Sequence, residues 1–115
     1  MKTLVSDCPI EGVMQVLSGR WPSLLLYYLQ EGTKRFSELR RDNPELSHRI
    51  LSLELRKLEQ AGLVALTAFE GYPSRVEYDL TPSGAQIMPM IDQLADWWEA
   101  SAVERQRQTA PARAG

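Results

Sequence analysis

The sequence contains little of the chemistry that most enzymes and metalloproteins require. Its 115 residues include one cysteine, Cys8, and one histidine, His48. A single cysteine allows no intrachain disulfide, and one Cys with one His cannot complete a tetrahedral zinc site within one chain. No phosphate-binding loop, catalytic triad spacing or paired-carboxylate pocket is visible. We therefore expect a protein that is not an enzyme and that needs no metal or other cofactor.

Long hydrophobic runs are also missing. The longest, from Leu24 to Leu29, is far shorter than the roughly 20 residues that a transmembrane helix needs, and no signal peptide is visible. We expect a soluble, cytoplasmic protein with no membrane partner. The length suits one domain, residues 8–102, between a flexible N-terminus (1–7) and a disordered tail (103–115) that lacks apolar periodicity.

Charge is segregated along the chain rather than present in large excess. The formal net charge is −2 and the isoelectric point is about 5.4, so the whole molecule is not a general binder of polyanions. Residues 34–57, however, hold seven Lys or Arg against four Asp or Glu, whereas the rest of the chain holds six against eleven. Any nucleic-acid surface must therefore come from this local segregation of charge.

A helix with two chemically different faces is predicted over residues 47–60. Ser47 is a suitable N-cap, because its hydroxyl can accept a hydrogen bond from an amide of the first turn. Ile50 or Leu51, Leu55 and Leu58 recur at helical spacing and predict a buried stripe. The rest of the helix carries hydrogen-bond donors, namely His48, Arg49, Ser52, Arg56 and Lys57. Such a face suits the major groove of DNA, although solvated amphipathic helices of this kind are common.

The elements around this helix predict the fold class. A very short strand at Arg35 and Phe36, a helix capped by Ser37 and a break at Pro44 precede it, which gives a helix-turn-helix order. Two strand-like runs follow, residues 63–69 and 75–80, separated by turn residues that favour a hairpin. We therefore predict an α+β winged helix-turn-helix domain, mainly helical, with a two- to three-stranded β-wing.

Further helices are predicted at both ends of the domain. Apolar periodicity indicates one helix that begins at Cys8-Pro9 and a second, apolar nearly all round, that begins at Trp21. A long last helix begins with Thr81 as N-cap and Pro82 in the first turn. Its apolar stripe consists of Ile87, Met90 or Ile91, Leu94, and Trp97 or Trp98.

Several short motifs occur in a characteristic order over residues 8–100. They lie in Cys8–Glu11, Gly19–Trp21, Leu25–Gly32, Arg35–Arg40, Leu58–Val64, Arg75–Gly84 and Leu94–Trp97. Together they resemble the HxlR-type winged helix-turn-helix regulators, which are MarR-like. The resemblance implies a small bacterial transcription factor that binds DNA as a homodimer. It also implies that the first and last helices build the dimer interface and that the wing flanks the recognition helix.

The resemblance further implies roles for single residues. Helix 47–60 corresponds to the recognition helix, Arg75 to the basic residue of the wing, and Cys8 to a cysteine through which many members respond to oxidants or electrophiles. Two positions depart from the family pattern, because Arg20 stands where Lys is common and Leu53 stands where a polar residue is common. Leu53 would meet a thymine methyl group if it faced outward, or pack into the core if it faced inward.

The predicted DNA contacts form three groups. His48, Arg49 and Ser52 lie at the start of the recognition helix, the end that reaches base edges, and the Arg49 fork suits guanine O6 and N7. Arg75 would enter the narrow minor groove, or would only keep a sheet edge soluble. The remaining contacts are expected to be mainly with phosphates: Ser37, Arg40, Ser47, Arg56 and Lys57.

Two interpretations of Cys8 stay open. A thiol at a helix start is favoured as thiolate by the helix dipole, although Asp7 and Glu11 oppose this effect. Cys8 would then sense oxidants or electrophiles through a Cys8–Cys8 bridge between subunits, a mixed disulfide or an adduct. Otherwise it is a small, half-buried hydrophobic residue.

A set of apolar residues at the two ends of the domain is predicted to be a dimer interface, because an exposed stripe requires a partner. The set consists of Ile10, Val13, Met14, Ile91, Leu94, Trp97 and Trp98. A ligand pocket lined by Trp97, Trp98, Met88 and Met90 is the alternative.

These patterns together predict a homodimeric, sequence-specific regulator of transcription. We expect it to act as a repressor on a pseudo-palindromic site in double-stranded DNA and to respond to an oxidant or a small-molecule electrophile through Cys8. The alternative is a winged helix that makes only protein–protein contacts, which the acidic isoelectric point permits.

Overall fold

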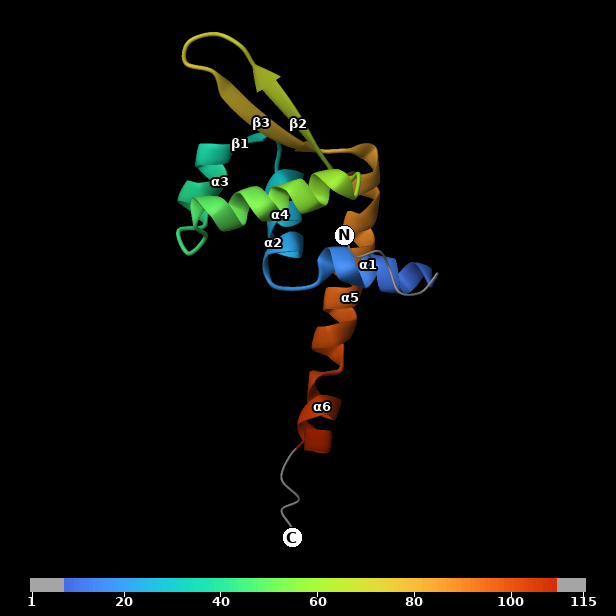
Figure 1. The fold of residues 1–115 in the computed structure, drawn as a ribbon. Helices are drawn as coiled ribbons and strands as arrows, with labels where there is room; N and C mark the ends of the chain where they lie inside the picture. Colours follow the sequence, from blue (N-terminus) through green and yellow to red (C-terminus); the bar gives the residue numbers. More distant parts are fainter. Residues whose placement is uncertain (1–7, 110–115) are drawn as a thin grey trace.

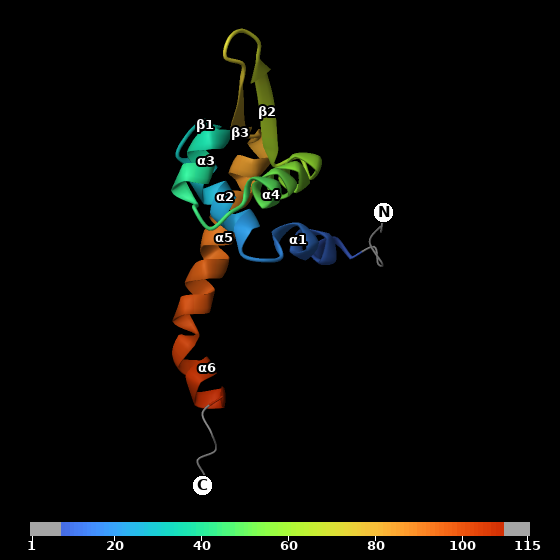
Figure 2. The same cartoon turned by 60° about the vertical axis from the view of Figure 1, so that its left-hand side comes forward.

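The computed structural model describes residues 8–109 as helices around a small antiparallel sheet (Figures 1 and 2). The predicted flexible N-terminus, 1–7, and the last residues, 110–115, lie outside the described part. In chain order the elements are α1 (Pro9–Leu17), α2 (Trp21–Gln30), β1 (Lys34–Arg35), α3 (Phe36–Asp42), α4 (His48–Gln60), β2 (Val64–Phe69), β3 (Arg75–Leu80), α5 (Pro82–Ala100) and α6 (Ala102–Thr109). The predicted winged helix-turn-helix fold is confirmed.

The core forms where α2 lies against α4, α5 and the sheet (Figure 1). Leucine side chains dominate it because α2 is apolar nearly all round and α4 contributes a continuous stripe. The side chains that are buried most completely include Leu25, Leu26, Leu39, Leu51, Leu55, Leu58 and Met88. The helix-turn-helix is therefore built directly on the core, which fixes the orientation of α4.

The sheet has the strand order β1-β3-β2, and both pairs of strands are antiparallel. Alternation along β3 directs Val76, Tyr78 and Leu80 toward the core, as the sequence pattern predicts. Burial raises the pKa of the Tyr78 hydroxyl above its usual value, and the nearby Glu59 carboxylate adds to this effect. The opposite face of β3 carries Arg75, Glu77 and Asp79, and the Thr33 hydroxyl donates a hydrogen bond to Asp79.

Two predicted helix caps are confirmed. The Ser47 hydroxyl accepts a hydrogen bond from the Ile50 amide at 3.1 Å, and α4 begins at the next residue. The Thr81 hydroxyl accepts one from the Gly84 amide at 3.0 Å and donates one to the Gly62 carbonyl at 2.6 Å. The second bond ties the start of α5 to the segment that directly follows α4, so the two helices meet at one corner.

Two local predictions around α3 are wrong. The short strand is Lys34–Arg35 rather than Arg35-Phe36, and α3 begins at Phe36, before Ser37. The reason is Glu38, whose carboxylate accepts a hydrogen bond of 2.8 Å from the Arg35 amide and so closes the first turn earlier. This bond also lowers the pKa of the Glu38 carboxyl.

The prediction of a disordered tail is wrong over residues 103–109, which belong to α6. Polar interactions replace the missing apolar stripe. The Arg105 guanidinium lies 3.2 Å from the centroid of the Trp98 ring and donates a hydrogen bond of 2.8 Å to the Trp98 carbonyl. Glu104 pairs with Arg107 at 3.1 Å along α6. The Glu104–Arg107 pair, three residues apart, is of the kind that stabilises a short helix without burying hydrophobic area.

The second half of α5, followed by α6, extends away from the body of the protein. Near its middle α5 is joined to α2 by a side-chain hydrogen bond, because the Tyr27 hydroxyl donates to Asp92 Oδ1 at 2.6 Å, which raises the pKa of Tyr27. Beyond this point α5 and α6 project away from the end that bears the wing (Figures 1 and 2). Within residues 8–109, no helix has both the length and the apolar composition that a membrane crossing requires.

Gly84 packs against the corner between α4 and β2, and we expect Gly84→Ala to destabilise the fold. A Cβ atom at this position would overlap the Leu63 carbonyl oxygen and also contact the Leu80 side chain at 3.2 Å. Overpacking costs about 1–3 kcal/mol, and a backbone atom cannot rotate away. Thermal unfolding should therefore show a clearly lower Tm. The neighbouring exposed Ser83→Ala is the matched control and should unfold like the wild type; an equal Tm for both variants would contradict the expectation.

Candidate nucleic-acid interface

The start of α4 presents the side chains that the sequence predicts as base readers. Arg49 is exposed and Ser52 is half-buried, on the side of the helix away from the Leu51, Leu55 and Leu58 stripe. Leu53 is 51% exposed, so it faces outward beside them rather than into the core. Among the described residues, Arg49 has no ion-pair partner. Its guanidinium is therefore available to a ligand outside the chain.

His48 is held more tightly than the sequence suggests. Its ring lies 4.7 Å from the Phe36 ring, centroid to centroid, at an angle of 49°. Phe36 in turn lies 6.5 Å from Tyr78 in the sheet. This row of rings connects the first turn of α4 to α3 and β3, so His48 orients the start of the helix in addition to facing solvent.

The later part of α4 carries two more basic residues. Arg56 is exposed and makes no ion pair with a described residue, whereas Lys57 is half-buried and lies 3.5 Å from the Glu54 carboxylate. That carboxylate oxygen, Glu54 Oε1, is buried and accepts no hydrogen bond from the described residues. Arg56 is consequently the better placed of the two for an external anion.

The helix before the turn contributes a second basic surface. Ser37 and Arg40 of α3 are exposed, as expected for backbone contacts. They line a hollow between α3 and the start of α4, together with Phe36, Arg41, Pro44 and His48. Arg41 was not among the predicted contacts, although its place beside Arg40 in the basic segment could have indicated it. The helix-turn-helix thus places these side chains of α3 and of the start of α4 around one hollow.

The wing carries Arg75 at the start of β3. Its guanidinium lies 4.3 Å from the centroid of the Phe69 ring, and its Nε is 2.9 Å from Glu77 Oε2. Arg35, at the junction of β1 and α3, also approaches this carboxylate, with its Nε 4.0 Å from Glu77 Oε2. Sequence patterns did not indicate Arg35 as a DNA contact, because its proximity to Arg75 depends on the pairing of β1 with β3.

Cys8 lies apart from these basic residues, at the N-cap position of α1. It is exposed and lines a mostly apolar hollow of about 490 Å³ between α1, the end of α4 and the start of α5. Val13, Val16, Leu63, Ile87 and Met90 contribute to the lining. An apolar molecule that entered this hollow would therefore meet the thiol at its rim.

Most of the predicted dimer-interface residues are exposed in the single chain. They include Ile10, Val13 and Met14 on α1, and Leu94, Trp97 and Trp98 on α5, with Trp97 63% exposed. Ile91 is different, because it is 8% exposed and belongs to the core of its own chain, whereas Met90 is 59% exposed. The Cα radius of gyration is 17.7 Å, against about 13 Å for a compact chain of this length. These surfaces therefore lie on a projecting part that lacks its own core.

Comparison with known proteins gives consistent matches. The model of the HxlR-like helix-turn-helix family matches residues 16–106. The HTH-type transcriptional regulator YdeP of Bacillus subtilis strain 168 is 39% identical over 92 residues, which are 80% of this chain and 72% of YdeP.

Solved structures of two regulators are similar over most of the chain. The redox regulator HypR in its reduced form is 37% identical, with a TM-score of 0.74 over 82% of this chain and 93% of HypR. The reduced transcriptional regulator YodB of B. subtilis is 28% identical, with a TM-score of 0.76 over 84% of this chain and 96% of YodB. HypR has also been solved in an oxidised form and YodB after diamide treatment.

Proposed function

Because this chain belongs to the HxlR-like helix-turn-helix family of transcriptional regulators, we propose that it represses transcription by binding a pseudo-palindromic DNA site as a homodimer. The observation that carries this proposal is the exposed face of α4. It places a histidine, a serine and an arginine that pairs with no acid within residues 8–109 at the start of a helix whose opposite face is buried in the core. The bound DNA would lie in the cytoplasm, which is where we place the protein.

The proposed binding mode follows from this face and from helix-turn-helix geometry. The two α4 helices of a dimer enter successive major grooves about 34 Å apart. Arg49, with His48 and Ser52, contacts base edges, and outward Leu53 meets a thymine methyl group. Phosphate contacts that fix the register come from Ser37, Arg40, Ser47, Arg56 and Lys57, and Arg75 approaches from the wing.

The proposed dimer interface combines α1 with the projecting half of α5. Ile10, Val13 and Met14 on the first helix and Leu94, Trp97 and Trp98 on the last are exposed apolar side chains. Burying them against a second copy removes this area from water, which is the main driving force of association. Both helices also adjoin the hollow that contains Cys8, so a change there would alter the spacing of the two recognition helices.

A selection experiment can test DNA binding and define the binding site at the same time. The purified protein would be used to select duplexes from a random-sequence pool, and the enriched duplex, here called the selected operator, would be titrated at several salt concentrations. We expect an inverted repeat and an affinity that falls steeply with salt, since phosphate contacts release counterions. A protein that enriches no sequence and shows no salt-dependent affinity would contradict DNA binding and favour a protein–protein module.

We further propose that Cys8 is the sensor of an oxidant or electrophile. It is the only thiol in the chain, it is exposed, and similarity to the redox regulator HypR favours this role. Diamide would take two electrons and two protons from two Cys8 thiols to form an intersubunit disulfide, or from Cys8 and a small thiol to form a mixed disulfide. A quinone would instead accept the thiolate as an adduct.

Replacing Cys8 by serine is therefore expected to abolish the response while sparing DNA binding. Wild-type protein treated with diamide or a quinone should change its affinity for the selected operator and gain a disulfide or an adduct detectable by mass spectrometry. The Cys8→Ser variant should bind the operator like the untreated wild type and remain unchanged by either reagent. Dithiothreitol should reverse the effect of diamide. A variant that still responds would exclude Cys8 as the sensor.

A further inference from the structure

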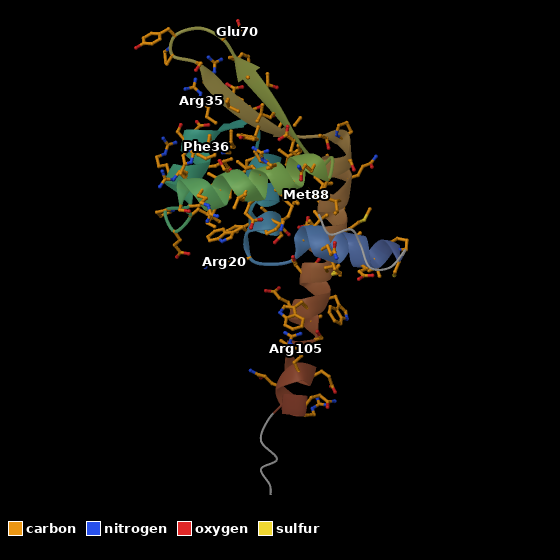
Figure 3. All side chains as sticks on the ribbon, in the orientation of Figure 1. Arg20, Arg35, Phe36, Glu70, Met88 and Arg105 are labelled. Carbon is orange, nitrogen blue, oxygen red and sulfur yellow. The ribbon has the colours of Figure 1, made fainter. Side chains whose placement is uncertain are left out.

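A second hollow lies between the wing and α3. The side chains there line a hollow of about 750 Å³, with Arg35 and Ser37 on one side and Tyr72, Ser74 and Arg75 on the other. Figure 3 shows Arg35 and Phe36 at the base of the wing and Glu70 in the loop at its tip. Glu70 is the one acidic residue among the described residues of this lining, so cationic and hydroxyl groups predominate.

Two arginines approach one carboxylate, that of Glu77. Arg35 and Glu77 are directly opposite each other in the β1–β3 pair, and directly opposite residues share a face of the sheet. Arg75 lies two residues before Glu77 on the same strand and therefore on the same face. Both guanidinium groups approach Glu77 Oε2 through Nε, at 2.9 Å for Arg75 and 4.0 Å for Arg35.

This arrangement leaves the outer ends of both guanidinium groups available. Pairing through Nε does not use the terminal nitrogens, which make no ion pair with another residue in the described range 8–109. Stacking on Phe69 at 4.3 Å also restricts Arg75. Arg75 is therefore a preoriented fork that suits the oxygen atoms of a phosphate, and Arg35 offers a second, more exposed fork beside it.

The hollow also continues toward the recognition helix. Phe36 and Ser37 line both this hollow and the one that contains Arg40, Arg41 and His48. β1 pairs only with Glu77 and Tyr78, so within the described residues the edge of β3 toward the wing tip has no neighbouring strand on that side. A DNA strand that follows this edge would pass from the start of α4 to the wing.

We propose that the hollow between α3 and the wing seats one phosphate of each DNA half-site, bound by Arg35 and Arg75 together. The seat lies where one strand crosses from the major groove at α4 toward the minor groove at the wing, and Ser37 adds a hydroxyl donor. Arg75 then binds the backbone rather than the floor of the minor groove. This assignment rests on the proposed function, because it needs the same docking of α4.

The test uses Arg35→Gln, Arg75→Gln and the double variant on the selected operator. Arg107→Gln, which removes an exposed charge on α6, is the matched control. The double variant is expected to bind at least about tenfold more weakly, since hydrogen bonds to charged groups contribute about 1.5–3 kcal/mol. The slope of log K against log salt should decrease by about 2, one phosphate per half-site. Base preference should stay unchanged, because phosphate contacts do not read sequence.

A phosphate scan locates the seat. Each backbone phosphate of the selected operator is replaced in turn by a neutral methylphosphonate. Replacement of several phosphates should weaken binding of the wild type, and at one of these positions per half-site the replacement should have no further effect on the double variant. The seat is excluded if every phosphate remains equally important in the double variant, or if that variant changes base preference while keeping its salt slope. Circular dichroism and Tm of each variant confirm folding.

The outcomes separate this proposal from the proposed function. If the wild type selects no operator and binds no duplex with salt dependence, DNA binding itself is excluded. If the wild type binds a selected operator while the Arg35 and Arg75 variants retain its affinity and salt slope, the seat is excluded and DNA binding stands.

Discussion

Alanine at Arg49 is expected to weaken binding of the dimer to its selected operator roughly thirtyfold or more. The reason is that one bidentate arginine–guanine pair discriminates by about 1–3 kcal/mol and a two-fold symmetric dimer makes it twice. The exposed Arg49 side chain has no ion-pair partner within the described residues, so its removal breaks no contact of this kind within the chain. Tm should therefore remain close to that of the wild type while affinity falls.

The matched control for Arg49→Ala is Arg56→Ala, about two turns further along α4. Arg56 is also exposed, but its position suits a phosphate, so its loss should weaken all sequences alike and reduce the salt slope. Arg49→Ala should instead relax base preference at one symmetric pair of positions in a repeated selection. An Arg49→Ala variant with unchanged affinity and unchanged preference would contradict the assignment of the α4 start to base reading.

Local chemistry made the starts of α4 and α5 and the wing predictable. Ser47 and Thr81 cap helices with hydrogen bonds between residues three apart, and such short-range signals are visible in the sequence. The alternation that places Val76, Tyr78 and Leu80 on one face is equally local. The exposed face of α4 follows from the same reasoning, because a buried stripe of leucines leaves the remaining positions to solvent.

The features that the sequence did not show depend on contacts between distant residues or on competing local bonds. Arg35 comes to lie beside Arg75 only because β1 pairs with β3, which brings Glu77 opposite Arg35. Apolar periodicity left open whether Met90 or Ile91 is buried. Because α5 packs on α2, Ile91 is buried and Met90 is exposed. For α6, the contacts of Arg105 with Trp98 stabilise a helix that hydrophobic patterning does not signal.

The dimer interface is the part of the proposal on which DNA affinity depends most strongly. A half-site bound by one subunit gains nothing from the second half-site unless the subunits are joined, so losing the dimer loses the combined affinity. Leu94 lies in the middle of the exposed apolar stripe of α5 and is 50% exposed in the single chain. A charge there should leave the chain folded and act on assembly alone.

Leu94→Glu is therefore expected to convert the dimer to monomers of 13.0 kDa, which light scattering after size-exclusion chromatography would detect. Two-fold symmetry places two carboxylates in the interface, and burial of unpaired charge should weaken association on the order of a thousandfold. The affinity for the selected operator should decrease together with the association of the subunits. The control is Gln106→Glu, which adds the same charge at an exposed position of α6, outside the proposed interface. If Leu94→Glu remains dimeric and binds the operator normally, the subunits associate through another surface, because a buried unpaired glutamate at this position is incompatible with the proposed interface.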